Sequence, residues 1–141
     1  YQYLEQYYKD ISYTGIDINQ KLIEIAQSDF KNAEFSTQDI LIDKINQSYD
    51  WIIASGIFNT DLKYESNIEY ITKMIEKMFF LSKKGVAIDF MHEYVDYKTP
   101  GSFHINLDEI FTILRALTKK INLRMDYLDY ECMFHIYKPI K

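Results

Sequence analysis

Short runs of β-branched and aromatic residues alternate with helix-length segments along most of this chain, and that alternation limits the folds open to it. The strand-like runs are 12–18, 33–36, 49–55 and 86–90, and the helical patterns are 19–30, 62–83 and 107–117. Strands separated by helices usually pair in parallel, so the pattern predicts an α/β sheet covered by helices. The apolar middle of 49–55 further predicts a strand covered on both faces.

The end of the chain departs from this alternation. Two segments with alternating apolar residues, 121–127 and 132–136, are separated by only a few turn-like residues. A helix does not fit between them, so they must be antiparallel neighbours. The sequence therefore predicts a mostly parallel sheet flanked by helices and ending in an antiparallel β-hairpin. Gly85, which follows Lys83 and Lys84, is interpreted as the stop signal of helix 62–83.

Length and charge narrow the class of protein. The chain has 141 residues, which suits a single domain. Its net charge of 16 − 21 = −5 argues against binding nucleic acid or an anionic membrane through bulk charge. No apolar run approaches the length of a membrane span, and the single cysteine, Cys132, cannot form an internal disulfide, which favours a cytoplasmic location. Because the first residue is Tyr1 rather than Met, we interpret the sequence as starting within a longer protein or after processing.

The candidate site consists of the residues that end each strand, because parallel sheets bind ligands beyond the carboxyl ends of their strands. Asp17 closes the first strand and could hold the two hydroxyl groups of a ribose, or cap the next helix. Asp39 and Ile40 follow the second strand and could bind an adenine edge, or Asp39 could begin a short helix. Ser55 and Gly56 end the third strand and could approach a ligand closely, or form a plain turn.

Two further candidates follow the fourth strand. His92 could act as a general base, or be a solvated loop histidine. Loop 92–106, which contains Tyr94, could be a lid over an acceptor, or an ordered connection packed by its own aromatic residues. The spacing of His, Cys, Asp and Glu matches no metal-binding motif, so the sequence predicts no metal site.

Three segments carry a family resemblance when they are taken in this order: Tyr13–Asn19 (YTGIDIN), Phe35–Leu41 (FSTQDIL) and Tyr49–Asn59 (YDWIIASGIFN). Together they resemble class I S-adenosylmethionine-dependent methyltransferases, whose Rossmann-like sheet also ends in one antiparallel strand. Segments 85–97 and 123–138 are similar to a bacterial subgroup of that family whose substrate is unassigned.

The resemblance implies a cofactor and residues that bind it. Asp17 matches the acidic residue that holds the ribose of S-adenosylmethionine, and Ile18 matches the residue that packs against the adenine. Asp39 and Ile40 match the pair that contacts the adenine edge.

The resemblance also implies where the acceptor binds. Ser55 and Gly56 match the end of the family's fourth strand, where the methionine half of the cofactor meets the acceptor. His92 and Tyr94 are the candidate acceptor-site residues, and no catalytic residue is assigned beyond them.

One part of the family pattern has no counterpart in this sequence. The first strand and its glycine-rich loop are expected upstream of Tyr1, so 1–141 is interpreted as a single methyltransferase-like domain that is N-terminally incomplete. Without that strand, the predicted strands 12–18 and 49–55 lack the neighbour that lies between them in the family. Upstream residues, re-pairing of the flanking strands, or a partner chain as in a homodimer would then fill the gap, and 1–141 alone is expected to bind the cofactor weakly.

Three functions stay open at this point. The first is S-adenosylmethionine-dependent methyl transfer to a small-molecule acceptor. The second is a non-catalytic interaction or regulatory module that keeps the methyltransferase fold. The third is a fragment of a nicotinamide-dependent oxidoreductase, because an acid at a strand end also suits that ribose. The antiparallel hairpin counts against the third.

Overall fold

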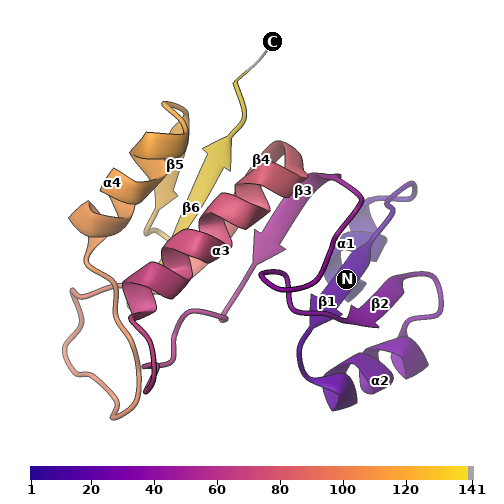
Figure 1. Ribbon diagram of the computed structural model, residues 1–141, viewed down its shortest axis with the longest axis horizontal. Helices are drawn as coiled ribbons and strands as arrows, with labels where there is room; N and C mark the ends of the chain where they lie inside the picture. Colours follow the sequence, from indigo (N-terminus) through magenta and orange to yellow (C-terminus); the bar gives the residue numbers. More distant parts are fainter. Residues whose placement is uncertain (140–141) are drawn as a thin grey trace. The chain divides into compact units, whose positions relative to one another are not determined.

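The computed structural model describes residues 1–139, and the chain divides into two compact units, Tyr1–Ile45 and a second unit that begins at Asn46. Both units combine helices with strands (Figure 1). The mixed α/β class predicted from the sequence is confirmed. Two of the strand pairs are parallel and two are antiparallel, however, and they belong to two separate sheets, so the predicted mostly parallel arrangement holds only in part.

The first unit is a short parallel β-α-β element preceded by a helix. Its elements are α1 (Gln2–Tyr7), β1 (Thr14–Asp17), α2 (Gln20–Asp29) and β2 (Glu34–Thr37). The sequence predicted a helix cap at Asn19, and the structure confirms it, because the Asn19 side chain accepts hydrogen bonds from the backbone N–H groups of Lys21 and Leu22 at 3.0 and 3.4 Å. Gly15 makes room for the ring of Phe35, which an added Cβ would approach to 2.6 Å.

The second unit is a four-stranded sheet with two helices. Its elements are β3 (Tyr49–Ala54), α3 (Asn67–Leu81), β4 (Ser82–Met91), α4 (Leu107–Leu117), β5 (Ile121–Arg124) and β6 (Glu131–Tyr137). The strand order is β3-β4-β6-β5, and β6 is antiparallel to both of its neighbours. The predicted terminal hairpin is therefore confirmed, and β6 also joins it to the centre of the sheet. Figure 1 shows α3 and α4 on one face of this sheet.

The core of the second unit lies between that face and the two helices. Side chains from the strands interlock with apolar side chains from α3 and α4, and the fully buried ones are Ile71, Ile75, Met78, Val86, Ile88, Phe90, Ile105, Ile110, Leu114, Cys132, Phe134 and Ile136. Phe90 stacks on Phe58 with ring centroids 5.3 Å apart and meets Phe134 edge-on at 6.2 Å. Burial of this apolar area is the main stabilising contribution to the unit.

The predicted helix over 62–83 is wrong at both ends. The helix begins after Ser66, whose hydroxyl accepts a hydrogen bond from the backbone N–H of Glu69 at 3.4 Å, and it ends at Leu81. Gly85 is not a helix stop but the fourth residue of β4, where it pairs with Trp51 on one side and Tyr137 on the other. Two lysines and a glycine imitate a helix end, and pairing with two neighbouring strands overrides that local signal.

The prediction that both faces of 49–55 are covered is also wrong. In β3, Ile52 and Ala54 face the helices, but Trp51 and Ile53 on the other face are 41% and 59% exposed. Within the described residues, β3 pairs only with β4, and β1 pairs only with β2. Among the described residues, β1 and β3 therefore each have one side without a paired strand.

No described helix is long and apolar enough to cross a membrane.

Cys132 is fully buried in β6, and burial, with the nearby Asp89 and Glu131 carboxyl groups, raises the pKa of its thiol to about 12. We expect iodoacetamide to label Cys132 in unfolded protein at pH 8 but not in native protein, which mass spectrometry would check. The pKa of this thiol is higher in the folded than in the unfolded state. Its contribution to the free energy of unfolding should therefore be fully present below about pH 8.5 and fall by up to about 1.4 kcal/mol per pH unit above that pH. A Cys132→Ala variant should lose part of that dependence, and an unchanged profile would contradict the assignment.

Candidate functional site

The carboxyl ends of β1 and β2 lie side by side in the first unit. The two strands are parallel and in register, so Asp17 pairs with Thr37, and the N–H of Gln38 donates to the carbonyl oxygen of Asp17 at 3.0 Å. Asp39 follows directly. The structure therefore brings Asp17 and Asp39, two of the predicted site residues, to one edge of the same small sheet.

Each of these two carboxylates uses one oxygen in a local hydrogen bond, and its other oxygen has no hydrogen-bond partner among the described residues. Oδ1 of Asp17 accepts the N–H of Asn19 at 2.7 Å, and Oδ1 of Asp39 accepts the N–H of Leu41 at 2.8 Å. The Asp39 interaction closes a turn rather than beginning the short helix that was the alternative reading. No described residue hydrogen-bonds to Oδ2 of Asp17 or Oδ2 of Asp39. Both oxygens are available to accept hydrogen bonds from a ligand.

Apolar side chains accompany both carboxylates. Ile18, next to Asp17, is 75% exposed, and Ile40, next to Asp39, is half-buried. An exposed isoleucine beside a free carboxylate oxygen combines apolar surface with a hydrogen-bond acceptor. A nucleoside is complementary to both, because its planar base can pack on the apolar surface and its pair of hydroxyl groups can donate to the carboxylate.

The carboxyl ends of β3 and β4 form a second cluster in the second unit. Ser55 and Gly56 follow β3, and both contact the carboxyl group of Asp89 on β4. The Ser55 hydroxyl donates to Oδ2 of Asp89, and the N–H of Gly56 donates to Oδ1 at 2.7 Å. Gly56 adopts a φ of 70°, which favours glycine. Asp89 therefore fixes the turn that ends β3.

Asp89 is the residue of this candidate site that sequence reasoning missed. It is only 5% exposed, and it interrupts the apolar run VAIDFM in the middle of the sheet. A lone acidic residue in a buried strand needs hydrogen-bond donors around it, and that rule is the signal that would have found it.

Asp89→Ala is expected to lower the free energy of unfolding by about 1–2 kcal/mol, because two donors lose a charged acceptor but lie close enough to the surface to be hydrated. Asp89→Asn, which keeps an acceptor for Gly56, should lose less than half as much. Urea denaturation of the two variants would check this. Equal effects of both substitutions would contradict the role assigned to the hydrogen bonds.

His92 follows β4 and is not the solvated loop histidine that was the alternative reading, because it is 3% exposed. Its Nδ1 accepts the N–H of Tyr94 at 3.2 Å, and its carbonyl oxygen accepts Nδ1–H of His104 at 2.9 Å. A neutral imidazole that accepts at Nδ1 carries its proton at Nε2. No described residue hydrogen-bonds to that Nε2–H, so His92 presents a donor rather than a basic lone pair. Tyr94 itself is 66% exposed.

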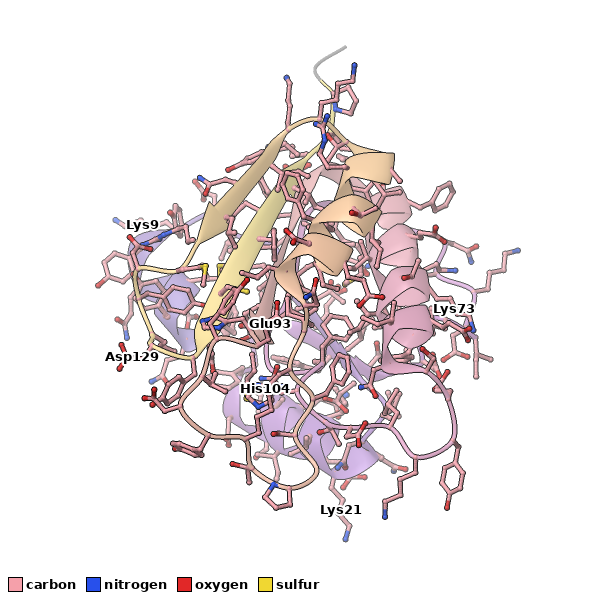
Figure 2. The ribbon with its side chains drawn as sticks, turned by 90° about the vertical axis from the view of Figure 1, so that its left-hand side faces the viewer. Lys9, Lys21, Lys73, Glu93, His104 and Asp129 are labelled. Carbon is pink, nitrogen blue, oxygen red and sulfur yellow. The ribbon has the colours of Figure 1, made fainter. Side chains whose placement is uncertain are left out.

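Loop 92–106 is anchored at both ends. His92 pairs with Ile105, and Ser102 pairs with Thr60, while the carbonyl oxygen of Gly101 accepts the N–H of Asp61 at 2.9 Å. Glu93 and His104 both belong to this loop (Figure 2). Loop aromatics also take part in its packing, since the ring of Tyr97 lies 5.8 Å from that of Tyr130.

Asn59, another polar residue after β3, is used structurally. Its Oδ1 accepts the N–H of Met91 at 3.1 Å, and its carbonyl oxygen accepts the N–H of Phe103 at 3.0 Å. It ties the segment after β3 to the end of β4 and to the loop. The second unit thus brings together Ser55, Gly56 and Asp89 in one cluster and His92 with Tyr94 in another, both at the carboxyl ends of parallel strands.

Comparisons with known proteins point to methyltransferases. The chain is 36% identical over 63 residues to ribosomal protein L11 methyltransferase of Dictyoglomus turgidum, a match that covers 42% of this chain and 21% of that protein. It is 27% identical over 127 residues to a Mycobacterium tuberculosis protein named as a methyltransferase, Rv1506c, covering 84% of this chain and 74% of that protein. No protein-family model matches the chain.

Solved structures agree in fold. Magnesium protoporphyrin IX methyltransferase from Synechocystis PCC 6803, with bound S-adenosylhomocysteine, aligns with a TM-score of 0.68 and 15% identity, covering 89% of this chain and 64% of that one. Further S-adenosylmethionine-dependent methyltransferases have the same fold. The chain therefore has the fold of S-adenosylmethionine-dependent methyltransferases, and it spans about a fifth and three quarters of the lengths of the two sequence relatives.

Proposed function

We propose that this methyltransferase-fold protein binds S-adenosylmethionine and transfers the methyl group to a small acceptor. The observation that carries the proposal is the pair of carboxylates, Asp17 and Asp39, at the carboxyl ends of two paired parallel strands, each with an unpartnered oxygen. We also propose that both units belong to one methyltransferase-like domain, and that the protein is cytoplasmic.

The residues of the first unit fit the nucleoside half of the cofactor. Oδ2 of Asp17 can accept a ribose hydroxyl while Oδ1 keeps its bond to Asn19. The exposed Ile18 offers apolar surface to the adenine, and Asp39 with Ile40 offers an acceptor and an apolar contact at the adenine edge.

The residues of the second unit suit the acceptor. When bound, S-adenosylmethionine supplies an electrophilic methyl group, so the protein's main task is to align an acceptor atom with it. The turn Ser55–Gly56, fixed by Asp89, offers a hydroxyl group and close backbone approach. Nε2–H of His92 can donate to the acceptor and orient it, and the exposed ring of Tyr94 can cover it.

Substituting His92 separates this orienting role from a structural one. His92→Asn places an amide oxygen near the position of Nδ1 and so keeps an acceptor for the N–H of Tyr94, but it removes the donor at Nε2. We expect about a tenfold loss in kcat/KM for the acceptor, the effect of one hydrogen bond. S-adenosylhomocysteine affinity should stay unchanged. A parallel loss of cofactor affinity would contradict the assignment.

Calorimetric titration of the full-length protein with S-adenosylhomocysteine tests the proposal, with NAD as the matched second ligand. We expect S-adenosylhomocysteine to bind and NAD not to bind. NAD binding instead would favour the oxidoreductase reading. Binding without transfer to any acceptor from a panel of small molecules would favour a non-catalytic module. If neither ligand binds, the proposal is wrong. Gel filtration of the same protein sample tests whether the protein is a homodimer.

A further inference from the structure

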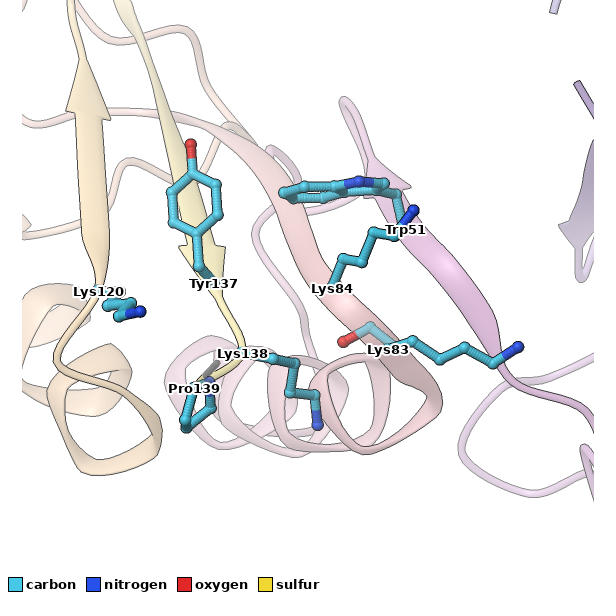
Figure 3. A pocket seen from close by; sticks show the side chains of 8 residues that line it. Trp51, Lys83, Lys84, Lys120, Tyr137, Lys138 and Pro139 are labelled. Carbon is cyan, nitrogen blue, oxygen red and sulfur yellow. The ribbon is translucent and has the colours of Figure 1, made fainter. Parts of the chain in front are cut away.

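A basic hollow lies at the opposite end of the four-stranded sheet from Ser55, Asp89 and His92. It has a volume of about 820 Å³ and is formed at the start of β4, the middle of β3 and the end of β6 (Figure 3). Its lining residues are Trp51, Ser82, Lys83, Lys84, Lys120, Tyr137, Lys138 and Pro139. We call it the lysine hollow. Four of its eight lining residues are lysines and none is acidic, although the protein as a whole has a net charge of −5.

Two aromatic rings stand beside each other in the lysine hollow. Trp51, Gly85 and Tyr137 pair in one row across β3, β4 and β6. Because Gly85 has no side chain, the indole of Trp51 leans over it, and an added Cβ would come within 2.7 Å of that ring. The indole and the phenol of Tyr137 lie 5.6 Å apart and are perpendicular at 88°. Figure 3 shows both rings rising from the sheet, and Trp51 is 41% exposed.

The lysines have few acidic partners. Lys84 pairs with Asp50 at 2.8 Å, and this hydrogen bond and charge hold the pKa of the Asp50 carboxyl below its usual value. Nζ of Lys138 lies 4.0 Å from the ring centre of Phe79, and burial lowers the pKa of Lys138. Within residues 1–139, no acidic side chain forms an ion pair with Lys83, Lys120 or Lys138. Lys83 also acts on the Asp50 carboxyl group through its charge, and the Lys138 ammonium group lies over Phe79, but none of the three is held in a direct ion pair, so together they can attract an anion.

We propose that the lysine hollow binds a small phosphorylated ligand with an aromatic ring, of the nucleoside diphosphate class. The ring stacks on Trp51 beside Tyr137, and the phosphates lie against Lys83, Lys120 and Lys138. Aromatic stacking and clustered ammonium groups are the two interactions that such a ligand combines. This site is independent of the proposed methyl transfer, because its residues are not among those assigned to cofactor or acceptor.

The chain offers a direct probe of this site, since Trp51 is its only tryptophan. We expect ADP to quench the fluorescence of Trp51 in the full-length protein, a signal that a Trp51→Phe variant lacks, with half-saturation below about 1 mM at low ionic strength. Adenosine lacks the phosphates and pyrophosphate lacks the ring, so each should bind about tenfold more weakly or not at all. S-adenosylhomocysteine at saturation should not compete.

A double variant, Lys83→Gln with Lys120→Gln, removes two charges that have no ion-pair partner in the described structure. We expect it to weaken ADP binding about tenfold and to leave the melting temperature unchanged. Lys73→Gln is the matched control, because Lys73 is an exposed lysine on α3 outside the lysine hollow (Figure 2). The proposal is overturned if the double variant and the control change ADP affinity equally. It is also overturned if ADP binds no more tightly than pyrophosphate, or if ADP does not change the fluorescence.

Discussion

Replacing Gly85 by alanine is expected to lower the free energy of unfolding by about 3 kcal/mol and the melting temperature by about 10 °C. The added Cβ would lie 2.4 Å from the carbonyl oxygen of Ile136 and 2.7 Å from the ring of Trp51. The first of these atoms belongs to the backbone of β6, which is paired with β4 along seven residues and cannot move aside cheaply. The indole can swing away only by giving up its contact with the sheet.

Gly56→Ala provides the matched control for this substitution. Nothing lies within 4 Å of a Cβ added at Gly56, but its φ of 70° strains any other residue. We therefore expect a loss of only about 1 kcal/mol from backbone conformation. Thermal denaturation followed by circular dichroism would measure both variants. If Gly85→Ala is no more destabilising than Gly56→Ala, the close packing over Gly85 is wrong.

The same glycine shows which part of the fold could be predicted from sequence. Periodicity alone predicted α2, α4 and the terminal hairpin, because each depends on residues close together in the chain. The boundary between α3 and β4 could not be predicted, because Lys83, Lys84 and Gly85 carry a helix-end signal. The strand forms there because β3 and β6 lie on either side, and that information comes from residues 34 and 52 positions away, Trp51 and Tyr137.

Some residues of the candidate site could likewise be predicted from sequence, and others could not. Asp17 and Asp39 were predicted because Asp17 closes one strand-like run and Asp39 lies just beyond another, and parallel pairing then brings the two strand ends together. Asp89 lies inside a strand and faces Ser55 and Gly56 only through the pairing of β4 with β3. The donor character of His92 depends on one hydrogen bond from the N–H of Tyr94, which no sequence pattern encodes.

Asp17→Ala is expected to weaken S-adenosylhomocysteine binding about 30- to 150-fold, which corresponds to about 2–3 kcal/mol. The proposed role of Asp17 is to accept charge-assisted hydrogen bonds from ribose hydroxyl groups through the oxygen that has no partner in the protein. Asp39→Ala should lose less, about 1 kcal/mol, because the adenine edge can keep backbone contacts. Isothermal titration calorimetry of the full-length variants would measure both.

The structure supplies the control that this experiment needs, because Asp17 also accepts the N–H of Asn19 at 2.7 Å. Asp17→Ala removes both interactions, so a loss of affinity could come from a disturbed start of α2. Asp17→Asn keeps an oxygen for Asn19 but removes the charge, and it should weaken binding about tenfold while leaving the melting temperature unchanged. An Asp17→Asn variant that binds like the parent protein, beside an Asp17→Ala variant that does not, would show that Asp17 only shapes the turn. Affinity that falls stepwise through the two substitutions, at constant stability, would place the carboxylate against the ribose.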